Sequence, residues 1–169
     1  IYCADYISKK LDIPAERIGV FGMSHGGYAT MRLVTFPGEV NGNKASFKFG
    51  FGIETAGFCD IIYQHMHSNI PDWTALEAGD PVKDAARLID RSPLYHAEKL
   101  TGPLLLLHGN HDNRVDIEGS RLLDRKLTHL NLPHRYVEFE GLGHGIKGVD
   151  NNCKFYYECF RFLDEIEDK

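Results

Sequence analysis

A serine enclosed by glycines is the clearest chemical feature of the sequence. Residues 20–28 read VFGMSHGGY, with Gly22 and Gly26 two positions before and after Ser24. A serine on a sharp turn between a strand and a helix takes a strained backbone conformation, and small residues at those two positions let the strand and the helix pass closely. Ser24 is therefore the candidate nucleophile. The amide of His25, at the start of the expected helix, is the candidate oxyanion donor.

A serine nucleophile needs an imidazole that takes its proton and a carboxylate that orients the imidazole. Residues 108–115, HGNHDNRV, follow the most apolar run of the chain, and Asp112 is their only carboxylate. His144 lies between two glycines after the last expected strand. Each of these residues falls in a loop after a strand, and the chain order Ser24, Asp112, His144 is that of the α/β-hydrolase triad.

Other interpretations of these residues remain open. Asp112 could cap the helix that follows, although Asp116 lies closer to the start of that helix and suits a cap better. His25 and His111 could compete as the base. However, His25 adjoins the nucleophile and would point away from it on a helical turn, and His111 directly precedes the acid. These positions favour His144 as the base.

The sequence offers weak metal-ligand patterns only. His65 and His67 form one close pair and His108 and His111 another, and neither pair has a third ligand nearby. The four cysteines lack a C-x-x-C pair and zinc-like spacing, which favours small buried side chains and leaves the cellular compartment open. We therefore assign no metal and no cofactor.

The elements that must position these residues alternate along the chain. Apolar runs predict strands at residues 17–21, 49–53, 104–108 and 134–139, and helical spacing predicts helices at residues 1–11, 28–36, 117–130 and 151–166. Residues 39–48 are expected to form a surface loop. This alternation predicts an α/β fold of three layers, in which a mostly parallel sheet has helices on both faces.

Residues 57–97 are too long for a simple connection and carry the only tryptophan, Trp73, and a helix candidate at residues 81–89. Segments above the carboxyl ends of parallel strands often build substrate pockets. A solvated excursion with a few packed aromatic side chains is the other interpretation.

Composition limits the classes of partner. The 169 residues are 43% hydrophobic and 25% charged, which suits one globular domain spanning residues 1–169. The net charge of −5 offers no basic surface, so we expect no nucleic-acid partner and no anionic membrane. The apolar runs are too short to cross a bilayer, and no signal-like segment opens the chain.

Four blocks in order resemble the catalytic domain of the prolyl oligopeptidase family of serine peptidases: GMSHGGY at 22–28, RSPL at 91–94, HGNHDNRV at 108–115 and GHG at 143–145. The resemblance implies an α/β-hydrolase fold, a peptide substrate, and a triad of Ser24, Asp112 and His144. It also implies substrate binding by Arg114, two residues past the acid, with a surface ion pair as the alternative. Tyr63 falls near the family's aromatic lining of the pocket for the residue before the scissile bond.

The chain departs from the family in its extent. Members carry a β-propeller or similar domain ahead of the hydrolase domain, and their sheet has more strands than are found here. We therefore expect a partial domain, the carboxyl-terminal part of a larger enzyme. The second oxyanion donor would then come from an upstream loop. The part of the first expected strand at residues 18–21 is apolar and lacks the charges, prolines and bulges that protect a sheet edge, so we expect a further strand to pair with it.

Two rival functions remain. An esterase would keep the triad and take carboxylic esters, since fold and triad serve both chemistries. A hydrolase-like binding domain would have no activity. The sequence leaves open the peptide specificity and association into a homo-oligomer.

Overall fold

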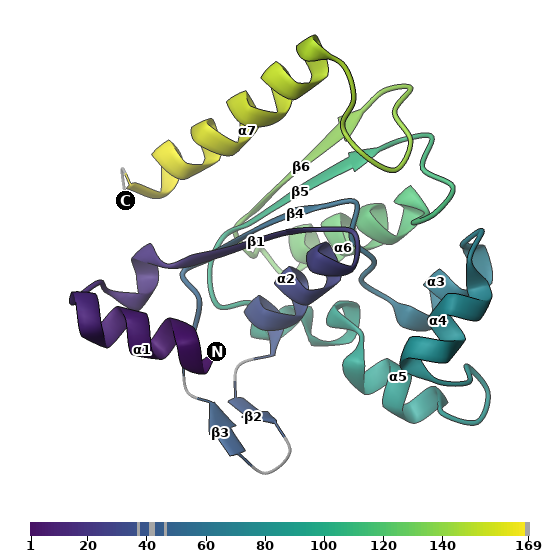
Figure 1. Cartoon of the computed structure of the whole chain (residues 1–169), viewed down its shortest axis with the longest axis horizontal. Helices are drawn as coiled ribbons and strands as arrows, with labels where there is room; N and C mark the ends of the chain where they lie inside the picture. The colour runs from purple at the N-terminus through teal and green to yellow at the C-terminus, as the bar shows by residue number, and fades with distance from the viewer. Residues whose placement is uncertain (37, 41–42, 46, 168–169) are drawn as a thin grey trace.

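The computed structural model describes residues 1–36, 38–40, 43–45 and 47–167 (Figure 1). In chain order the elements are α1 (Tyr2–Leu11), the 3-10 turn η1 (Ala15–Arg17), β1 (Gly19–Met23), α2 (His25–Thr35), β2 (Gly38–Val40), β3 (Asn43–Ala45), β4 (Phe51–Thr55), α3 (Ile61–His67), α4 (Pro71–Ala78), α5 (Ala85–Arg91), the 3-10 segment η2 (Pro93–Lys99), β5 (Leu104–Gly109), α6 (Ile117–His129), β6 (His134–Phe139) and α7 (Val149–Glu167).

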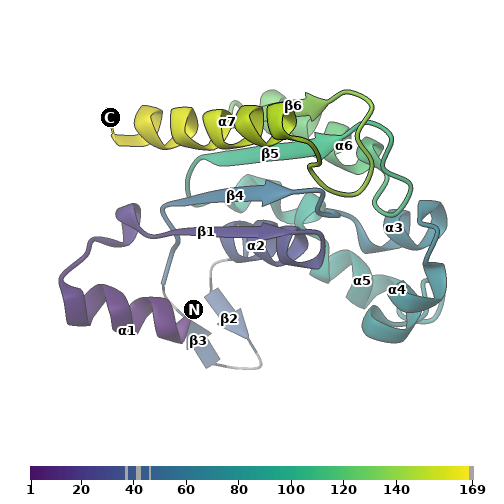
Figure 2. The same ribbon diagram turned by 45° about the horizontal axis from the view of Figure 1, so that its top comes forward.

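Four parallel strands form the central sheet in the order β1-β4-β5-β6. Because all four run the same way, their carboxyl ends meet at one edge, and α3, α4 and α5 lie beyond that edge (Figure 2). β1 pairs on one side only: within the described residues no strand continues the sheet past it.

The strand β5 shows how the sequence builds three layers. Its run of four leucines is fully buried, and successive side chains of a strand point to opposite faces. Leu104 and Leu106 pack with side chains of α2 and α6 on one face. Leu105 and Leu107 pack with Phe162 of α7 on the other. The expected α/β fold with helices on both faces is therefore confirmed.

Most predicted elements are present with shifted ends. The strand expected at residues 49–53 is β4, Phe51–Thr55, and the helix expected at residues 28–36 begins earlier, at His25. A Cβ atom on Gly50 would lie 2.0 Å from the carbonyl oxygen of Glu16, so the residues before β4 pass against η1. The glycines in this run indicate a close backbone approach, but the partner, η1, is set by tertiary packing that sequence spacing does not reveal.

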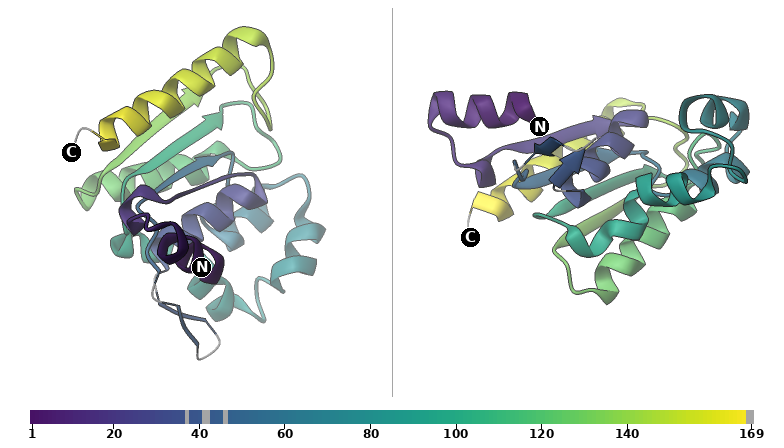
Figure 3. Two further views of the ribbon diagram at one scale, coloured as in Figure 1. Left: turned by 60° about the vertical axis from the view of Figure 1, so that its left-hand side comes forward. Right: turned by 90° about the horizontal axis from the view of Figure 1, so that it is seen from below.

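Two segments differ from expectation. The surface loop expected at residues 39–48 contains β2 and β3, which pair antiparallel as a hairpin that stands away from the central sheet (Figure 3), and residues 41, 42 and 46 lie outside the described part. Residues 57–97 hold three helices and η2, and the helix expected at residues 81–89 is α5, Ala85–Arg91. Asp60 is the N-cap of α3: its side chain accepts hydrogen bonds from the amides of Ile62 and Tyr63. The spacing of apolar residues does not reveal such a cap.

None of the described helices has the length and apolar character that a membrane span requires.

Candidate active site

Ser24 sits on a strained turn between β1 and α2. Its φ of 58° and ψ of −120° lie in a region that residues with a side chain rarely adopt. The Ser24 amide donates to the carbonyl of Thr55 at 2.8 Å, and the Ser24 carbonyl accepts from the amide of Tyr28 at 3.0 Å. Bonds on both sides thus hold the turn, and its side chain lies at the carboxyl edge of the sheet.

One of the two glycines that flank Ser24 has the function expected of it, and the other does not. A Cβ atom on Gly22 would lie 2.3 Å from the carbonyl oxygen of Gly26, so Gly22 is required for the strand and helix to pass. A Cβ atom on Gly26 would meet no described atom within 4 Å outside its chain neighbours and its own helix backbone. The expectation that residue 26 must be small for the strand and helix to pass is therefore wrong. Gly27 is the helix residue that must be small, because a Cβ atom on it would lie 2.8 Å from the Cα of Gly57.

A chain of hydrogen bonds joins Ser24, His144 and Asp112, which come from three different loops. The Ser24 hydroxyl lies 2.9 Å from Nε2 of His144, and Nδ1 of His144 lies 2.7 Å from Oδ2 of Asp112. A carboxylate only accepts, so Nδ1 carries the proton and Nε2 accepts from the serine hydroxyl. This arrangement suits proton transfer from the serine to the imidazole.

Asp112 is buried and accepts hydrogen bonds at both oxygens. Its Oδ1 accepts from the amides of Arg114 at 2.9 Å and Val115 at 3.0 Å. Burial alone would raise the pKa of Asp112, but hydrogen bonds from His108, His144 and the two amides together hold that pKa well below its usual range. The acid is therefore an anion at neutral pH, facing His144.

The helix-cap alternative for Asp112 does not hold, since Asp116 caps α6 by accepting from the amide of Glu118 at 2.8 Å.

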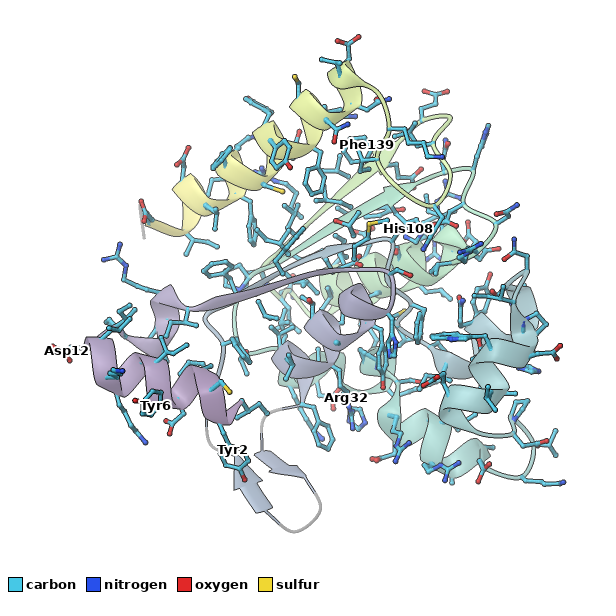
Figure 4. The ribbon with its side chains drawn as sticks, in the orientation of Figure 1. Tyr2, Tyr6, Asp12, Arg32, His108 and Phe139 are labelled. Carbon is cyan, nitrogen blue, oxygen red and sulfur yellow. The ribbon has the colours of Figure 1, made fainter. Side chains whose placement is uncertain are left out.

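His108 is a contact of the acid that the sequence did not single out. It is fully buried at the carboxyl end of β5 (Figure 4), with Nε2 3.3 Å from Oδ2 of Asp112 and 3.0 Å from the carbonyl of Val115. Its Nδ1 lies 2.7 Å from the hydroxyl of Ser120. Both contacts of Nε2 are acceptors, so Nε2 carries the proton, and His108 donates to Oδ2, the oxygen that the backbone amides do not contact. The signal available in the sequence is a histidine ending a buried apolar run four residues before the acid.

The loops that carry the acid and His144 brace each other. The His111 amide donates to the carbonyl of Leu142 at 2.8 Å, and the side-chain oxygen of Asn110 accepts from the amide of Gly141 at 2.7 Å. Gly141 and Gly145 have φ values of 74° and 130°, which let the second loop fold back over the sheet. The distance between acid and base is therefore fixed by backbone contacts as well as by side chains.

An aromatic pocket of about 200 Å³ lies beside the nucleophile turn. Its lining includes Phe58 and Trp73, and the ring of Phe58 stacks on Tyr28 at 4.7 Å between centroids. His25 lies in the same group, with its ring 5.4 Å from that of Trp73. The His25 side chain thus faces the pocket and not the base position, while its amide, the first of α2, has no partner within the helix.

Arg114 and Tyr63 lie in neighbouring segments. Arg114 is exposed, and its carbonyl accepts from the side chains of Gln64 at 2.8 Å and Ser68 at 2.7 Å. Across the described residues, the ion pairs made by arginine side chains all involve other arginines. Its guanidinium is thus not committed to the surface ion pair that was the alternative.

Tyr63 is partly buried in α3 and stacks on His67 with ring centroids 3.9 Å apart. Burial and the negative charges of Asp116 and Glu118 raise its pKa. Its ring does not line the aromatic pocket beside Ser24, where Phe58 and Trp73 stand instead.

The described residues contain no group of three or more histidine, cysteine or acidic side chains arranged to hold a metal ion. In each of the two histidine pairs of the sequence, one ring nitrogen has a protein partner: His65 Nδ1 contacts the carbonyl of Pro71, and His108 Nε2 contacts Asp112.

Comparison with known proteins gives consistent similarities. The chain is 30% identical over 149 residues to dipeptidyl aminopeptidase BIII of Pseudoxanthomonas mexicana, covering 83% of this chain and 20% of that protein. The structure resembles dipeptidyl peptidase 4 of Porphyromonas gingivalis with a TM-score of 0.80 and 26% identity, over 96% of this chain and 21% of that one. It resembles the acylaminoacyl peptidase of Pyrococcus horikoshii with a TM-score of 0.79 and 25% identity, over 96% of this chain and 26% of that one.

The chain thus spans about a fifth to a quarter of the length of these three proteins. The profile of the prolyl oligopeptidase family matches residues 1–169. By that match and these similarities, the chain belongs to the prolyl oligopeptidase family.

Proposed function

We propose that this chain carries the catalytic triad of a serine peptidase, with Ser24 as nucleophile, His144 as general base and acid, and Asp112 as the group that orients His144. The observation that carries the proposal is the chain of hydrogen bonds from the Ser24 hydroxyl through His144 to Asp112, at 2.9 and 2.7 Å. The strained turn at Ser24 supports it, because such strain is retained where it positions a reacting group.

The reaction follows from the proton positions. Ser24 Oγ attacks the scissile carbonyl carbon as its proton passes to Nε2 of His144, and the carbonyl oxygen becomes an oxyanion that the amide of His25 stabilises. His144 then gives the proton to the leaving amine, which departs and leaves an acyl ester on Ser24. Water attacks that ester with His144 again as the base, which releases the acid and restores the serine.

We assign the aromatic pocket to the side chain of the residue whose carbonyl is attacked. Phe58 and Trp73 supply apolar walls beside His25, whose amide faces the oxyanion. Arg114, exposed two residues past the acid, binds a substrate carbonyl with charge-assisted hydrogen bonds. We keep Tyr63 of α3 as a candidate substrate contact outside this pocket.

We further propose that the chain is the carboxyl-terminal part of a larger hydrolase domain. The outer edge of β1 has no strand partner within the described residues, and Phe21 on that strand is 62% exposed. An apolar, unpaired edge is normally protected, so its exposure supports pairing with an upstream strand. The second oxyanion donor would then come from that upstream part.

Parallel assays of the full-length protein test the peptidase assignment. We expect it to hydrolyse both an aminoacyl or dipeptidyl amide and a short-chain ester, and Ser24→Ala to remove both activities while the thermal unfolding curve is unchanged. Thr35→Ser, a conservative hydroxyl change at the far end of the same helix, serves as the control. Ester hydrolysis without amide hydrolysis would identify an esterase, and neither activity would identify a binding domain.

A further inference from the structure

A buried glutamate lies directly behind the nucleophile turn. Glu54, in β4, has no exposed surface, and its Oε2 accepts from the amide of Gly57 at 2.8 Å. Its other oxygen, Oε1, is buried without a hydrogen-bond partner among the described residues. An acidic side chain in such a place is costly, and such groups are retained where they have a specific function.

Gly57, whose amide donates to Glu54, packs against the first turn of α2. A Cβ atom on Gly57 would lie 2.7 Å from the carbonyl carbon of Gly27 and 2.8 Å from the amide nitrogen of Tyr28. The backbone of Gly57 therefore packs directly against that first turn. A Cβ atom on Gly27 would in turn lie 2.9 Å from Oε2 of Glu54, so the carboxyl group, Gly57 and Gly27 form one packed contact.

The same short segment contacts the nucleophile. The backbone carbonyl of Thr55, next to Glu54, accepts a hydrogen bond from the Ser24 amide at 2.8 Å. Ala56 has a φ of 49°, an uncommon conformation for a residue with a side chain, and the Glu54 bond to Gly57 closes the turn around it. Phe58, which lines the aromatic pocket, is the residue after Gly57.

We propose that Glu54 is a positioning residue for the reaction: by holding the amide of Gly57, its carboxyl group fixes the first turn of α2 and so the oxyanion-binding amide of His25. The inference rests on the proposed function of Ser24. It assigns the effect to an acceptor at the position of Oε2, and not to a negative charge.

The environment supports an uncharged acid. Burial raises the pKa of Glu54 to about 8, so at neutral pH the side chain holds a proton. Because Oε2 accepts from Gly57, the proton belongs on Oε1. The thiol of Cys59 is the titratable neighbour on which the charge of Glu54 would act, and burial keeps that thiol protonated by raising its pKa.

Three substitutions of Glu54 distinguish the effect of an acceptor within reach of the Gly57 amide from the effect of an acidic group. Glu54→Gln keeps the acceptor in reach of Gly57 and removes the acid. Glu54→Asp keeps the acid but is one methylene shorter, and Glu54→Leu keeps the volume without an acceptor. We expect kcat for amide hydrolysis by the full-length protein to stay within about threefold for Gln, and to fall about 10- to 100-fold for Asp and Leu with KM little changed, because small displacements of catalytic groups are costly. Glu98→Gln, at an exposed glutamate of η2, is the matched control.

A second measurement does not depend on activity. Hydrogen exchange followed by mass spectrometry should show faster exchange over residues 56–60 and the first turn of α2 in Glu54→Leu, with exchange unchanged in Glu54→Gln. If Glu54→Leu keeps full kcat and normal exchange, or if Glu54→Gln loses as much as Glu54→Leu, the inference is wrong. If the wild-type protein hydrolyses no amide, the proposed function fails, and the exchange pattern still decides whether Glu54 fixes the turn.

Discussion

Replacing Asp112 with asparagine gives a sharp test, because the surrounding donors determine how the new amide must lie. The amides of Arg114 and Val115 both donate to Oδ1. An asparagine therefore keeps its oxygen at that position and places its NH₂ group where Oδ2 was, facing Nδ1 of His144. The reverse orientation would set the NH₂ group against two backbone donors. The first orientation displaces only the Nε2–H of His108, which keeps the carbonyl of Val115 as an acceptor at 3.0 Å.

In that orientation His144 must change tautomer. Its Nδ1 has to accept from the asparagine, so the proton moves to Nε2, the atom 2.9 Å from the Ser24 hydroxyl. A protonated Nε2 cannot take the serine proton. We expect kcat for amide hydrolysis to fall about 10⁴-fold, equivalent to about 5 kcal/mol of transition-state stabilisation, which is the loss known for the same change in another serine triad.

The assay is steady-state hydrolysis of a chromogenic amide by the full-length protein, with thermal unfolding measured alongside. Asp116→Asn is the matched control, since that carboxylate lies four residues further on and caps α6 through the amide of Glu118. We expect the control to keep kcat within about twofold, because Asp116 is not joined to His144. If Asp112→Asn keeps more than about a tenth of the wild-type kcat, Asp112 is not the orienting acid.

Three further predictions follow from the structure. Burial raises the pKa of Glu54 to about 8, whereas a glutamate of the unfolded chain loses its proton near pH 4.3. Between these two pH values the folded protein holds one proton more than the unfolded chain. The free energy of unfolding should therefore fall as pH rises through this range, by up to about 1.4 kcal/mol per pH unit. Chemical denaturation at pH 5, 6, 7 and 8 should show that Glu54→Gln lacks this fall, and equal slopes for the two proteins would contradict it. Arg114→Ala should lower kcat/KM for extended peptides much more than for a small activated ester, with Arg125→Ala as the control at another exposed arginine; equal losses on both substrates would show a structural effect. The isolated 169-residue chain should aggregate and hydrolyse amides far more slowly than the full-length protein, because the outer edge of β1 has no strand partner within the described residues; a monomer on size-exclusion chromatography with the full-length rate would refute this.

Local pattern was enough to predict the four strands of the central sheet, most of the helices that flank it and the three loops of the candidate site. The run of four leucines in β5 is buried on both faces, as a continuous apolar run predicts for a parallel strand. Because parallel strands end at one edge, a serine, an acid and a histidine placed after three of them were expected to lie close together. Their hydrogen bonds join them in the expected order.

Contacts that form only once the loops have folded could not be predicted. The contact of His108 with Asp112, the packing of Gly27 on Gly57 and the stacking of Phe58 on Tyr28 each depend on how a loop folds back on the sheet. Glu54 is a similar case, because alternation along β4 places a glutamate in the interior and only the turn that follows supplies its partner. Sequence spacing therefore located the reacting groups but not the residues that hold them in place.

Covalent labelling by a fluorophosphonate probe tests the central claim most directly. Such probes react with a serine that is activated by a neighbouring base, so we expect the full-length protein to be labelled once, with the modified peptide mapped to Ser24 by mass spectrometry. His144→Ala should lose labelling to the same extent as Ser24→Ala, since the triad acts as a unit. Labelling at a different serine, or labelling that persists in His144→Ala at the wild-type rate, would contradict the account.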